Sequence, residues 1–349
     1  MDRVVLVRHV MFAALIFGIS ATITDLLVRY LKVVDVPNAR SSHQNPTTRG
    51  GGVSIVIAFL VGVVFIHFIG DKSPIYSLYF GGFLAAAFII AAISFYDDMR
   101  HCPFRVKLTG QLLAIIVAMQ AGIVIDVMHL PVLGLVELGG WAYLLTLLWV
   151  FGLTNAYNFM DGLDGLAAGT AVIAALFLAF VSFQQGSHFI YLASLTLAAA
   201  ALGFLIFNLP TAKIFMGDVG STFLGLVFAV MAVIASRYDH SHTSLFVVPL
   251  LLLHFIFDTT FTFLRRLLAG EQVFMAHRTH LYQLLNRMGL SHGKVTAIYS
   301  ALAVVQGVAA IAMVSAEGEV RVLMFVPFLL VYATAAFRIV SVARRRQLI

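Results

Sequence analysis

The sequence predicts an all-α polytopic membrane protein, and three observations support this fold class. The chain has 349 residues, of which 61% are hydrophobic and only 11% are charged. Soluble domains use about half apolar and about a quarter charged residues, and the mean hydropathy here is +0.99. Apolar runs of about 20 residues, the length that crosses a bilayer as a helix, recur along the whole chain. We therefore expect one integral-membrane domain over residues 1–349.

About eleven apolar segments are long enough to be transmembrane helices. The expected spans are 9–29, 52–70, 76–95, 109–127, 138–155, 166–183, 188–207, 219–236, 244–264, 294–315 and 321–340. The first segment could be mistaken for a cleaved signal peptide. Its apolar stretch is long and the acid Asp25 follows closely, so we interpret it as a retained span.

The basic residues are distributed unevenly over the connecting loops. Of the 22 Lys and Arg residues, 17 lie on one side, in five of the six segments that we assign to that side. The six segments are 29–51, 96–108, 156–165, 208–218, 265–294 and the tail from Arg338. A Lys/Arg bias marks the cytoplasmic side, so we expect a cytoplasmic C-terminus, an outside N-terminus and location in a bacterial inner (plasma) membrane. The single cysteine, Cys102, excludes an internal disulfide framework.

The first cytoplasmic loop carries basic residues and ends in glycines. It reads DVPNARSSHQNPTTRGGG and contains Arg40, His43 and Arg49 before three glycines that open a span. Backbone N–H groups at a glycine-rich helix start can bind phosphate, and basic side chains strengthen such a site. The alternative is an ordinary positively charged loop, because glycine-rich helix starts are weak motifs.

The second loop begins with two adjacent acids at a predicted helix end. Asp97 and Asp98 repel each other unless a cation joins them, and the negative end of the helix disfavours them further. Such a placement favours a divalent metal site or a catalytic base. The alternative is pairing with Arg100, Arg105 or Lys107 nearby.

The third and fourth loops add three more acids. Asp161 and Asp164 in NFMDGLDG are three residues apart, so both lie near one face if a helix begins there. Asp218 stands between glycines before another span. Its carboxylate suits a hard cation such as Mg²⁺, and Lys213 is a candidate phosphate partner. The alternative for all three acids is capping of the helices that follow.

The fifth loop, 265–294, is the longest and most basic. It contains His277, Arg278 and His280, which we interpret as an anion clamp. A metal pair at i, i+3 and scattered surface histidines are the alternatives. The five loops together indicate a metal and polyanion site at the cytoplasmic membrane surface. The chain contains no Walker A, G-x-G-x-x-G, H-E-x-x-H or G-x-S-x-G motif, so ATP hydrolysis, hydride transfer and serine hydrolysis lose support.

Four motifs in this chain resemble those of a known family. YDDM, NFMDGLDG, FNLPTAKIFMGDVGS and HRTHLYQ, in this order and with these gaps, are similar to the polyprenyl-phosphate N-acetylhexosamine-1-phosphate transferases. This is glycosyltransferase family 4, with the WecA and MraY types. The resemblance runs from about Asp35 to Lys294. It implies ten or eleven transmembrane helices around an active-site cleft that faces the cytoplasm.

The resemblance also implies a reaction and roles for individual residues. The family transfers a sugar 1-phosphate from a UDP-sugar to undecaprenyl phosphate, releases UMP and requires Mg²⁺, with Mn²⁺ as an alternative metal. Catalytic roles are implied for Asp97, Asp98, Asp161 and His280, and metal binding for Asp218 with Asp98. The expected substrate-binding residues are Arg40, His43, Arg49, Asn158, Leu163, Asp164, Asn208, Lys213, Phe215, His277 and Arg278. Of these, Leu163 and Asp164 would lie nearest the uracil, and Phe215 would stack on it.

The expected partners are the UDP-N-acetylhexosamine donor, undecaprenyl phosphate and the lipid bilayer. No nucleic-acid partner is expected, and a homodimer is left open. The HRTHLYQ form departs from the H-x-H-H run of the WecA type and from the three histidines of the MraY type. It looks more like the subgroup that starts O-antigen synthesis with GlcNAc or a 6-deoxy relative such as QuiNAc or FucNAc.

Two alternative functions stay open at this stage. One is a peptidoglycan or teichoic-acid type of the same family. The other is a secondary transporter of an anionic metabolite, which predicts polar residues within the spans. The spans hold few polar residues, namely Asp25, His67, His254, Asp258 and Thr259–Thr260.

Overall fold

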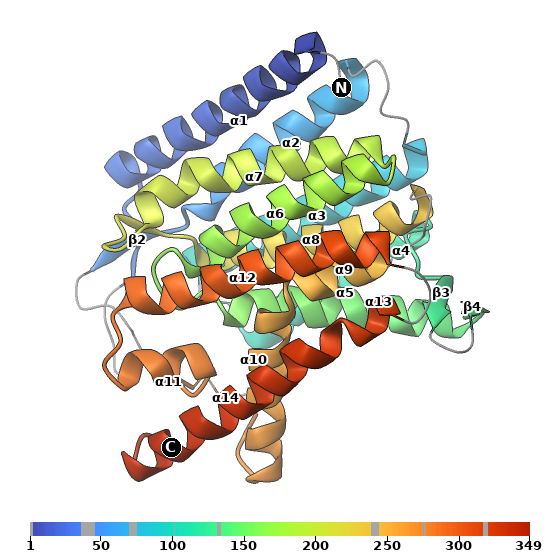
Figure 1. Cartoon of the computed structure of the whole chain (residues 1–349). Coiled ribbons are helices and arrows are strands. Elements are labelled where there is room, and N and C mark those ends of the chain that lie inside the picture. Colours follow the sequence, from blue (N-terminus) through green and yellow to red (C-terminus); the bar gives the residue numbers. More distant parts are fainter. Residues whose placement is uncertain are drawn as a thin grey trace.

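The structure, a computed structural model, is a bundle of α-helices (Figure 1), which confirms the predicted class. It describes residues 3–35, 46–69, 75–100, 102–130, 134–238, 244–273, 275, 277–316 and 320–349. The helices are α1 (Arg3–Tyr30), α2 (Gly52–Ile69), α3 (Ser77–Arg100), α4 (Phe104–Gln120), α5 (Trp141–Phe159), α6 (Leu166–Gln184), α7 (His188–Asn208), α8 (Gly217–Tyr238), α9 (Ser244–Leu251), α10 (Leu253–Leu268), α11 (Leu281–Arg287), α12 (His292–Ser315), α13 (Val320–Leu323) and α14 (Phe325–Arg345).

Each of the expected spans falls on a helix or on a pair of consecutive helices. Among the described residues, seven helices are long and apolar enough to cross a membrane, or up to eight with one bent pair. The chain is therefore a polytopic membrane protein, while the number of eleven crossings stays a prediction.

The bent pair divides the span expected over 244–264. The axes of α9 and α10 differ by 72°, and α10 leaves the bundle at a steep angle in Figure 1. Pro249 lies inside α9, within one turn of the break. A proline disturbs the turn that precedes it, whereas this break follows Pro249, at Leu252, so the proline does not account for the bend.

The structure also contains short strands that the sequence did not reveal. A three-stranded sheet joins β1 (Val34–Asp35), β2 (Thr47–Arg49) and β5 (Ile214–Phe215), with β2 parallel to β5. A hairpin pairs β3 (Val127–Leu130) with β4 (Gly134–Glu137). The strands of the sheet have only two or three residues, which is below the length at which an alternating pattern is recognisable.

Helix α8 lies at the centre of the bundle, because 94% of its apolar window is buried. It packs against α2, α3, α5 and α9. The starts of α2 and α8 approach closely through two glycines, since a Cβ built on Gly52 would lie 2.4 Å from the Cα of Gly220. This approach places the beginning of α8 beside the loop that precedes α2.

We expect Gly52→Ala to destabilise the protein by about 1–3 kcal/mol, because the added methyl group meets backbone that cannot move aside easily. Thermal unfolding of the purified protein measures this. Gly81→Ala is the matched control, because a Cβ there has no atom within 4 Å and alanine favours helix. Equal stability of the two variants would contradict the close packing of α2 on α8.

The two ends of the bundle differ in what they carry. In Figure 1, β2, α11 and the C-terminus lie at the left end, and the start of α1 and the β3–β4 hairpin lie at the right end. The five loops predicted to be cytoplasmic thus meet at one end, and the two termini lie at opposite ends. This agrees with an odd number of crossings, although the side that faces the cytoplasm stays a prediction.

Candidate active site

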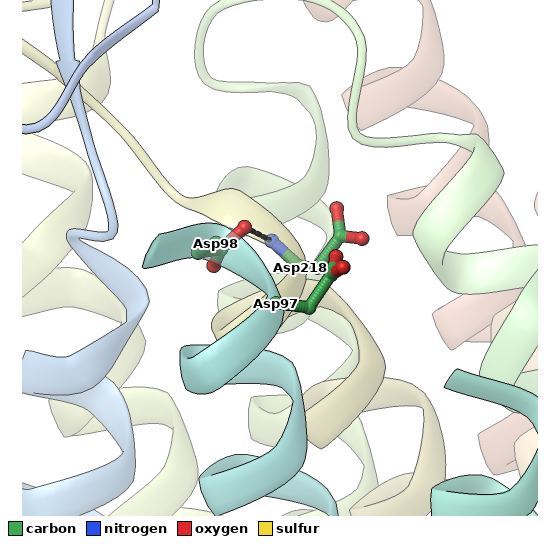
Figure 2. Close-up of side chains that lie close together, drawn as sticks. All are labelled: Asp97, Asp98 and Asp218. Atoms are coloured by element: carbon green, nitrogen blue, oxygen red, sulfur yellow. Dashed lines mark hydrogen bonds between the residues drawn. The ribbon is translucent and has the colours of Figure 1, made fainter. Parts of the chain in front are cut away.

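Three carboxylates from two helices meet at the left end of the bundle. Asp97 and Asp98 lie in the last turn of α3, and Asp218 lies in the first turn of α8. One carboxylate oxygen of each lies within 4.8 Å of the others, and Figure 2 shows the side chains of Asp97 and Asp218 close together. Asp97 is only 3% exposed and Asp98 only 2%, so their charges must be compensated nearby.

Asp98 receives two hydrogen bonds from the first turn of α8. The backbone N–H groups of Asp218 and Val219 donate to its two carboxylate oxygens, at 3.0 and 2.9 Å. The N–H groups that begin a helix lack partners within it, so Asp98, and not Asp218, caps α8. Gly217 makes this possible: its φ is +76°, and a Cβ there would lie 2.6 Å from Asp98 Oδ2.

Two basic side chains bridge the three acids. Arg49 Nη2 lies 2.8 Å from Asp98 Oδ1 and 2.8 Å from Asp218 Oδ1. Lys107 Nζ lies 2.6 Å from Asp97 Oδ2 and 2.6 Å from Asp218 Oδ2. Burial lowers the pKa of Arg49, but the Asp218 and Asp98 carboxylates more than offset this, and its pKa lies above the ordinary value.

Lys107 is a residue of the site whose contact with Asp218 was not predicted from the sequence. It was considered only as a possible counter-ion of Asp97 and Asp98, whereas it also contacts Asp218 from 111 residues away. The available signal was its position in the first turns of α4, just after the loop that carries the paired acids. The pairing itself depends on how α3, α4 and α8 pack.

The three carboxylates fit a hard divalent cation. Asp97, Asp98 and Asp218 offer oxygen ligands close enough to share one ion, and Mg²⁺ or Mn²⁺ prefers such ligands. Arg49 and Lys107 contact the same oxygens. A bound metal would therefore compete with these two side chains for the acids.

Asp161 lies close to this cluster, in the loop between α5 and α6. Among the described residues its carboxylate makes no hydrogen bond or ion pair that would stabilise the charge. Burial, and then the negative charge of Asp218, raise its pKa to about 7. Asn158, near the end of α5, donates from Nδ2 to Ser221 Oγ in the first turns of α8, at 2.9 Å. The predicted residues Asn158 and Asp161 thus lie beside the three acids.

Asp164 and Asn208 hold neighbouring loops together. Asp164 Oδ2 accepts a hydrogen bond from the N–H of Ala212 at 3.1 Å, and Oδ1 lies 3.3 Å from His292 Nδ1. Asn208 accepts from the N–H of Gly165 at 3.0 Å and donates to the Ile214 carbonyl at 2.8 Å. No side chain caps α6, which follows Gly165, so capping does not explain Asp164.

Leu163 is 5% exposed and belongs to the apolar core. Contacts of Leu163, Asp164 and Asn208 with a nucleotide stay predictions. In the structure these three residues stabilise the loop that contains Asp161: Leu163 by packing in the core, and Asp164 and Asn208 by hydrogen bonds to neighbouring loops.

The glycines before α2 do not form the expected phosphate cradle. The N–H groups of Gly50 and Gly51 donate to the Phe215 carbonyl at 3.2 and 2.9 Å, and that of Gly52 donates to the Met216 carbonyl at 2.8 Å. These three donors are therefore already satisfied by the segment around β5. The glycines instead permit close packing: a Cβ on Gly51 would lie 2.5 Å from the Phe204 ring.

The remaining predicted residues near β5 are placed as follows. Phe215 is the register partner of Arg49 in the sheet, which puts it beside the acid cluster. Lys213 is exposed, and its N–H donates to the Phe207 carbonyl at 2.8 Å. Arg40 and His43 lie outside the described residues.

His277, Arg278 and His280 lie in the segment that leads into α11. The rings of His277 and His280 are 4.9 Å apart, and His280 stacks on Phe159 at the end of α5. Burial, and then the neighbouring His280, lower the pKa of His277 to about 3, so this ring is neutral at pH 7. The Nδ1 atom of His277 lies 3.1 Å from Thr279 Oγ1. The described contacts favour neither a metal pair nor an anion clamp.

Comparison with known proteins gives two findings that bear on this site. The family model described as Glycosyl transferase family 4 matches residues 80–236. A protein of Bacillus subtilis (strain 168), named probable undecaprenyl-phosphate N-acetylglucosaminyl 1-phosphate transferase, is 35% identical over 301 residues, which cover 85% of this chain and 81% of that protein. The chain belongs to glycosyl transferase family 4. The matched range contains all five acids of the site, and ends before the HRTH segment.

Other relatives of this family 4 chain carry related names. The decaprenyl-phosphate N-acetylglucosaminephosphotransferase of Mycobacterium tuberculosis (strain ATCC 25618 / H37Rv) is 32% identical over 314 residues, or 82% of this chain and 77% of that protein. A phospho-N-acetylmuramoyl-pentapeptide-transferase of Streptococcus thermophilus (strain ATCC BAA-250 / LMG 18311) is 30% identical over 250 residues, or 64% of this chain and 72% of that protein. The names of the relatives differ in the sugar, which is N-acetylglucosamine or N-acetylmuramoyl-pentapeptide. All three names describe the transfer of a sugar together with a phosphate group.

We expect Asp161→Asn to raise the thermal unfolding temperature of this family 4 protein by several degrees at pH 8 and to leave it unchanged near pH 4. The pKa of Asp161 in the folded protein is raised to about 7, so folding favours its protonated form. The stability of the wild type is therefore full below the unfolded pKa and falls as pH rises toward 7. Asparagine removes that loss. Unfolding temperatures of both proteins between pH 4 and pH 8 measure it, and parallel curves would contradict the raised pKa.

Proposed function

We propose that this protein transfers an N-acetylhexosamine 1-phosphate from a UDP-sugar to undecaprenyl phosphate and releases UMP. The observation that carries this proposal is the cluster of Asp97, Asp98 and Asp218, bridged by Arg49 and Lys107, at one end of an apolar helical bundle. An acid and base cluster of this kind suits two anionic substrates and a metal. The names of the relatives support the acceptor class and the sugar-phosphate group that is transferred.

The position of the site suits an acceptor anchored in a bilayer. An isoprenoid tail stays among the lipids, so its phosphate can reach only residues at the ends of the spans. Asp97 and Asp98 are at the end of α3, and Asp218 is at the start of α8. We place this end on the cytoplasmic side, since the Lys/Arg bias favours it and nucleotide sugars would enter from there.

The transfer is a displacement at phosphorus. An oxygen of the acceptor phosphate forms a bond to the β-phosphorus of the UDP-sugar, and the bond from this phosphorus to the bridging oxygen breaks, so that UMP leaves with that oxygen. We assign Asp97 to orient the acceptor phosphate and take any proton it carries. An aspartyl-phosphate intermediate is the alternative route and would use the same residues.

The other residues of the cluster bind and neutralise charge. Arg49 and Lys107 can turn from the carboxylates to the diphosphate when the substrates arrive, because both side chains are long and partly exposed. Charge-assisted contacts of this kind are stronger than neutral hydrogen bonds. Asn158, Asp164 and Phe215 line the side on which we place the uridine.

Asp218, Asp98 and Asp97 would hold Mg²⁺, with Mn²⁺ as the alternative, in this proposal. Such an ion, when bound, neutralises diphosphate charge and stabilises the leaving UMP. In the described part of the chain, two basic side chains bridge these three carboxylates, and the excess of negative charge favours a divalent cation.

For the sugar, we propose GlcNAc or a 6-deoxy relative, and for the pathway the first step of O-antigen or another cell-surface polysaccharide. HRTHLYQ in place of consecutive histidines supports this over the peptidoglycan type. The transporter alternative loses support, because several of the polar residues of the spans have local partners: Asp25 pairs with Arg29, and His254 contacts Gln306.

The test is release of UMP by the purified protein from a panel of donors in the presence of undecaprenyl phosphate and Mg²⁺. The panel contains UDP-GlcNAc, 6-deoxy UDP-N-acetylhexosamines and UDP-N-acetylmuramoyl-pentapeptide, and mass spectrometry identifies the lipid product. We expect one UMP per lipid-linked sugar with an N-acetylhexosamine donor. Uptake of a donor into proteoliposomes without UMP release would overturn the proposal in favour of transport.

A further inference from the structure

Asp258 is an acid buried within α10, away from the carboxylates at the ends of α3 and α8. It is 1% exposed, and it collects hydrogen bonds from three helices. The donors are the N–H groups of Leu281 (2.8 Å) and Tyr282 (3.1 Å), the Tyr299 hydroxyl (2.8 Å), the Thr262 hydroxyl (3.3 Å) and His280 Nδ1 (3.3 Å). A buried carboxylate with this many hydrogen-bond partners holds the donor groups around it in fixed positions.

Two of these bonds hold the start of α11. This helix has only seven residues, Leu281–Arg287, and so short a helix is not stable on its own. The N–H groups of Leu281 and Tyr282 are among those that begin the helix and lack partners within it. Asp258 accepts both of them and thereby fixes where α11 begins.

The same carboxylate orients the imidazole of His280. An ionised carboxylate can only accept hydrogen bonds, so its contact with Nδ1 assigns a proton to that nitrogen. Nε2 is then the nitrogen that can serve a ligand. The ring also stacks on Phe159 and Tyr282, with centroids 5.9 Å away in both cases.

Tyr282 connects Asp258 and the start of α11 to the loop that contains Asp161. Its hydroxyl donates to the Phe159 carbonyl at 2.9 Å. A Cβ built on Gly162 would lie 2.2 Å from the same hydroxyl oxygen, so the tyrosine packs directly against the loop beside Asp161. The chain Asp258–Tyr282–Phe159 therefore connects α10, α11 and the end of α5.

We propose that Asp258 is a positioning residue of the transferase site, which acts through His280 and Tyr282 and does not touch substrate. It sets the tautomer and direction of the His280 ring and holds α11 against the Asp161 loop. Carboxylates that orient a metal-bound histidine through its other ring nitrogen contribute about 10- to 100-fold to activity or metal affinity, and we take the same range for the orientation of His280. The effect on transfer rests on the proposed function, whereas the effect on α11 does not.

The kinetic test is a double-mutant cycle with Asp258→Asn and His280→Gln, with UMP release as the measurement. We expect Asp258→Asn to lower kcat about 10- to 100-fold and to leave the donor KM within about threefold. Because Asp258 acts in part through His280, the loss in the double variant should be smaller than the two single losses combined. Additive losses in the double variant would overturn the proposal.

Thr262→Val is the matched control. It removes the 3.3 Å bond from a neighbouring turn of α10 to the same carboxylate, and it leaves α11 and His280 untouched. We expect a kcat close to that of the wild type. A loss as large as that of Asp258→Asn would overturn the proposal, because a general disturbance of the buried carboxylate would then explain both.

Hydrogen exchange provides a measurement that does not depend on activity. Asp258→Asn should speed exchange of peptides that cover Leu281–Arg287 and leave those of α3 and α8 unchanged. The two N–H groups donate to different oxygens of Asp258, and asparagine replaces one of these oxygens by an NH2 group that cannot accept. Unchanged exchange in α11 would overturn the proposal even if activity fell. If the wild type transfers no sugar, the proposed function fails while this measurement still tests Asp258. Asp258→Glu, which moves the carboxylate by one methylene, replaces Asp258→Asn in both tests if the latter does not accumulate.

Discussion

Asp218→Asn is expected to lower sugar-phosphate transfer by at least about a thousandfold, which corresponds to about 4 kcal/mol of transition-state stabilisation. Asp218 is the acid that both basic side chains share, with Arg49 and Lys107 at 2.8 and 2.6 Å. An amide has one oxygen, carries no charge and is a poor ligand for Mg²⁺. The measurement is UMP release by the purified variant over a range of Mg²⁺ concentrations.

Loss of folding is not expected to explain this result. In Asp218→Asn, Arg49 keeps its ion pair with Asp98 and Lys107 keeps its ion pair with Asp97. The thermal unfolding temperature should therefore stay near that of the wild type. Asp126→Asn is the control for the same chemical change, since Asp126 pairs with Arg237 at the other end of α8. Near-normal transfer by Asp218→Asn would remove Asp218 from the metal site.

Much of the fold could be predicted from composition and span length, because a helix that crosses a bilayer must satisfy its own backbone and be apolar on its outside. The expected spans accordingly fall on helices. The break between α9 and α10 was not foreseen, because the run of leucines continues through it from Leu250 to Leu253. The short sheet was not foreseen because it pairs Arg49 with Phe215, and nothing local to either segment specifies that partner.

The candidate site was predictable as a set of unusual residues and not as a set of contacts. Asp97 and Asp98 stand out because two adjacent acids at the C-terminal end of an apolar helix are disfavoured without a cation, and Asp218 stands out as an acid between glycines before a span. Lys107 and Asp258 do not stand out in the same way. A lysine near a predicted cytoplasmic helix end is ordinary, and an acid within a span fits more than one function. Only the packing of α4 on α3, and of α10 on α11, gives these two residues their partners.

The glycines before α2 illustrate the opposite error. Gly50, Gly51 and Gly52 match the composition of a phosphate-binding helix start, but their N–H groups donate to the segment around β5. The sequence shows that glycines are present, but it does not show whether a ligand or another segment of the protein packs against them. Here the approaching group is the start of α8, which the glycines allow to lie beside Arg49 and the acids.

Lys107→Met is expected to separate metal binding from transfer. It should tighten Mn²⁺ binding without nucleotide about tenfold, or about 1.4 kcal/mol, and lower transfer about a hundredfold. Lys107 Nζ lies 2.6 Å from both Asp97 and Asp218; without it these carboxylates repel each other and attract a divalent ion more strongly. Transfer falls because the diphosphate loses a positive partner in a partly dry site, where a unit charge at 4 Å is worth up to about 4 kcal/mol.

Titration calorimetry with Mn²⁺ and the UMP assay measure the two effects on the same preparation. Arg105→Met is the matched control: Arg105 is exposed on the same helix and has the same charge, but it makes no described contact with the three acids. A general effect of net charge would change both variants alike, whereas the local competition changes only Lys107→Met. Weaker Mn²⁺ binding in Lys107→Met would show that the lysine assists the metal, and unchanged transfer would show that it does not meet the donor. Tighter Mn²⁺ binding together with slower transfer would show that Lys107 pairs with the acids in the free protein and with the diphosphate during transfer. A lysine that only stabilised the acids would not change the two quantities in opposite directions.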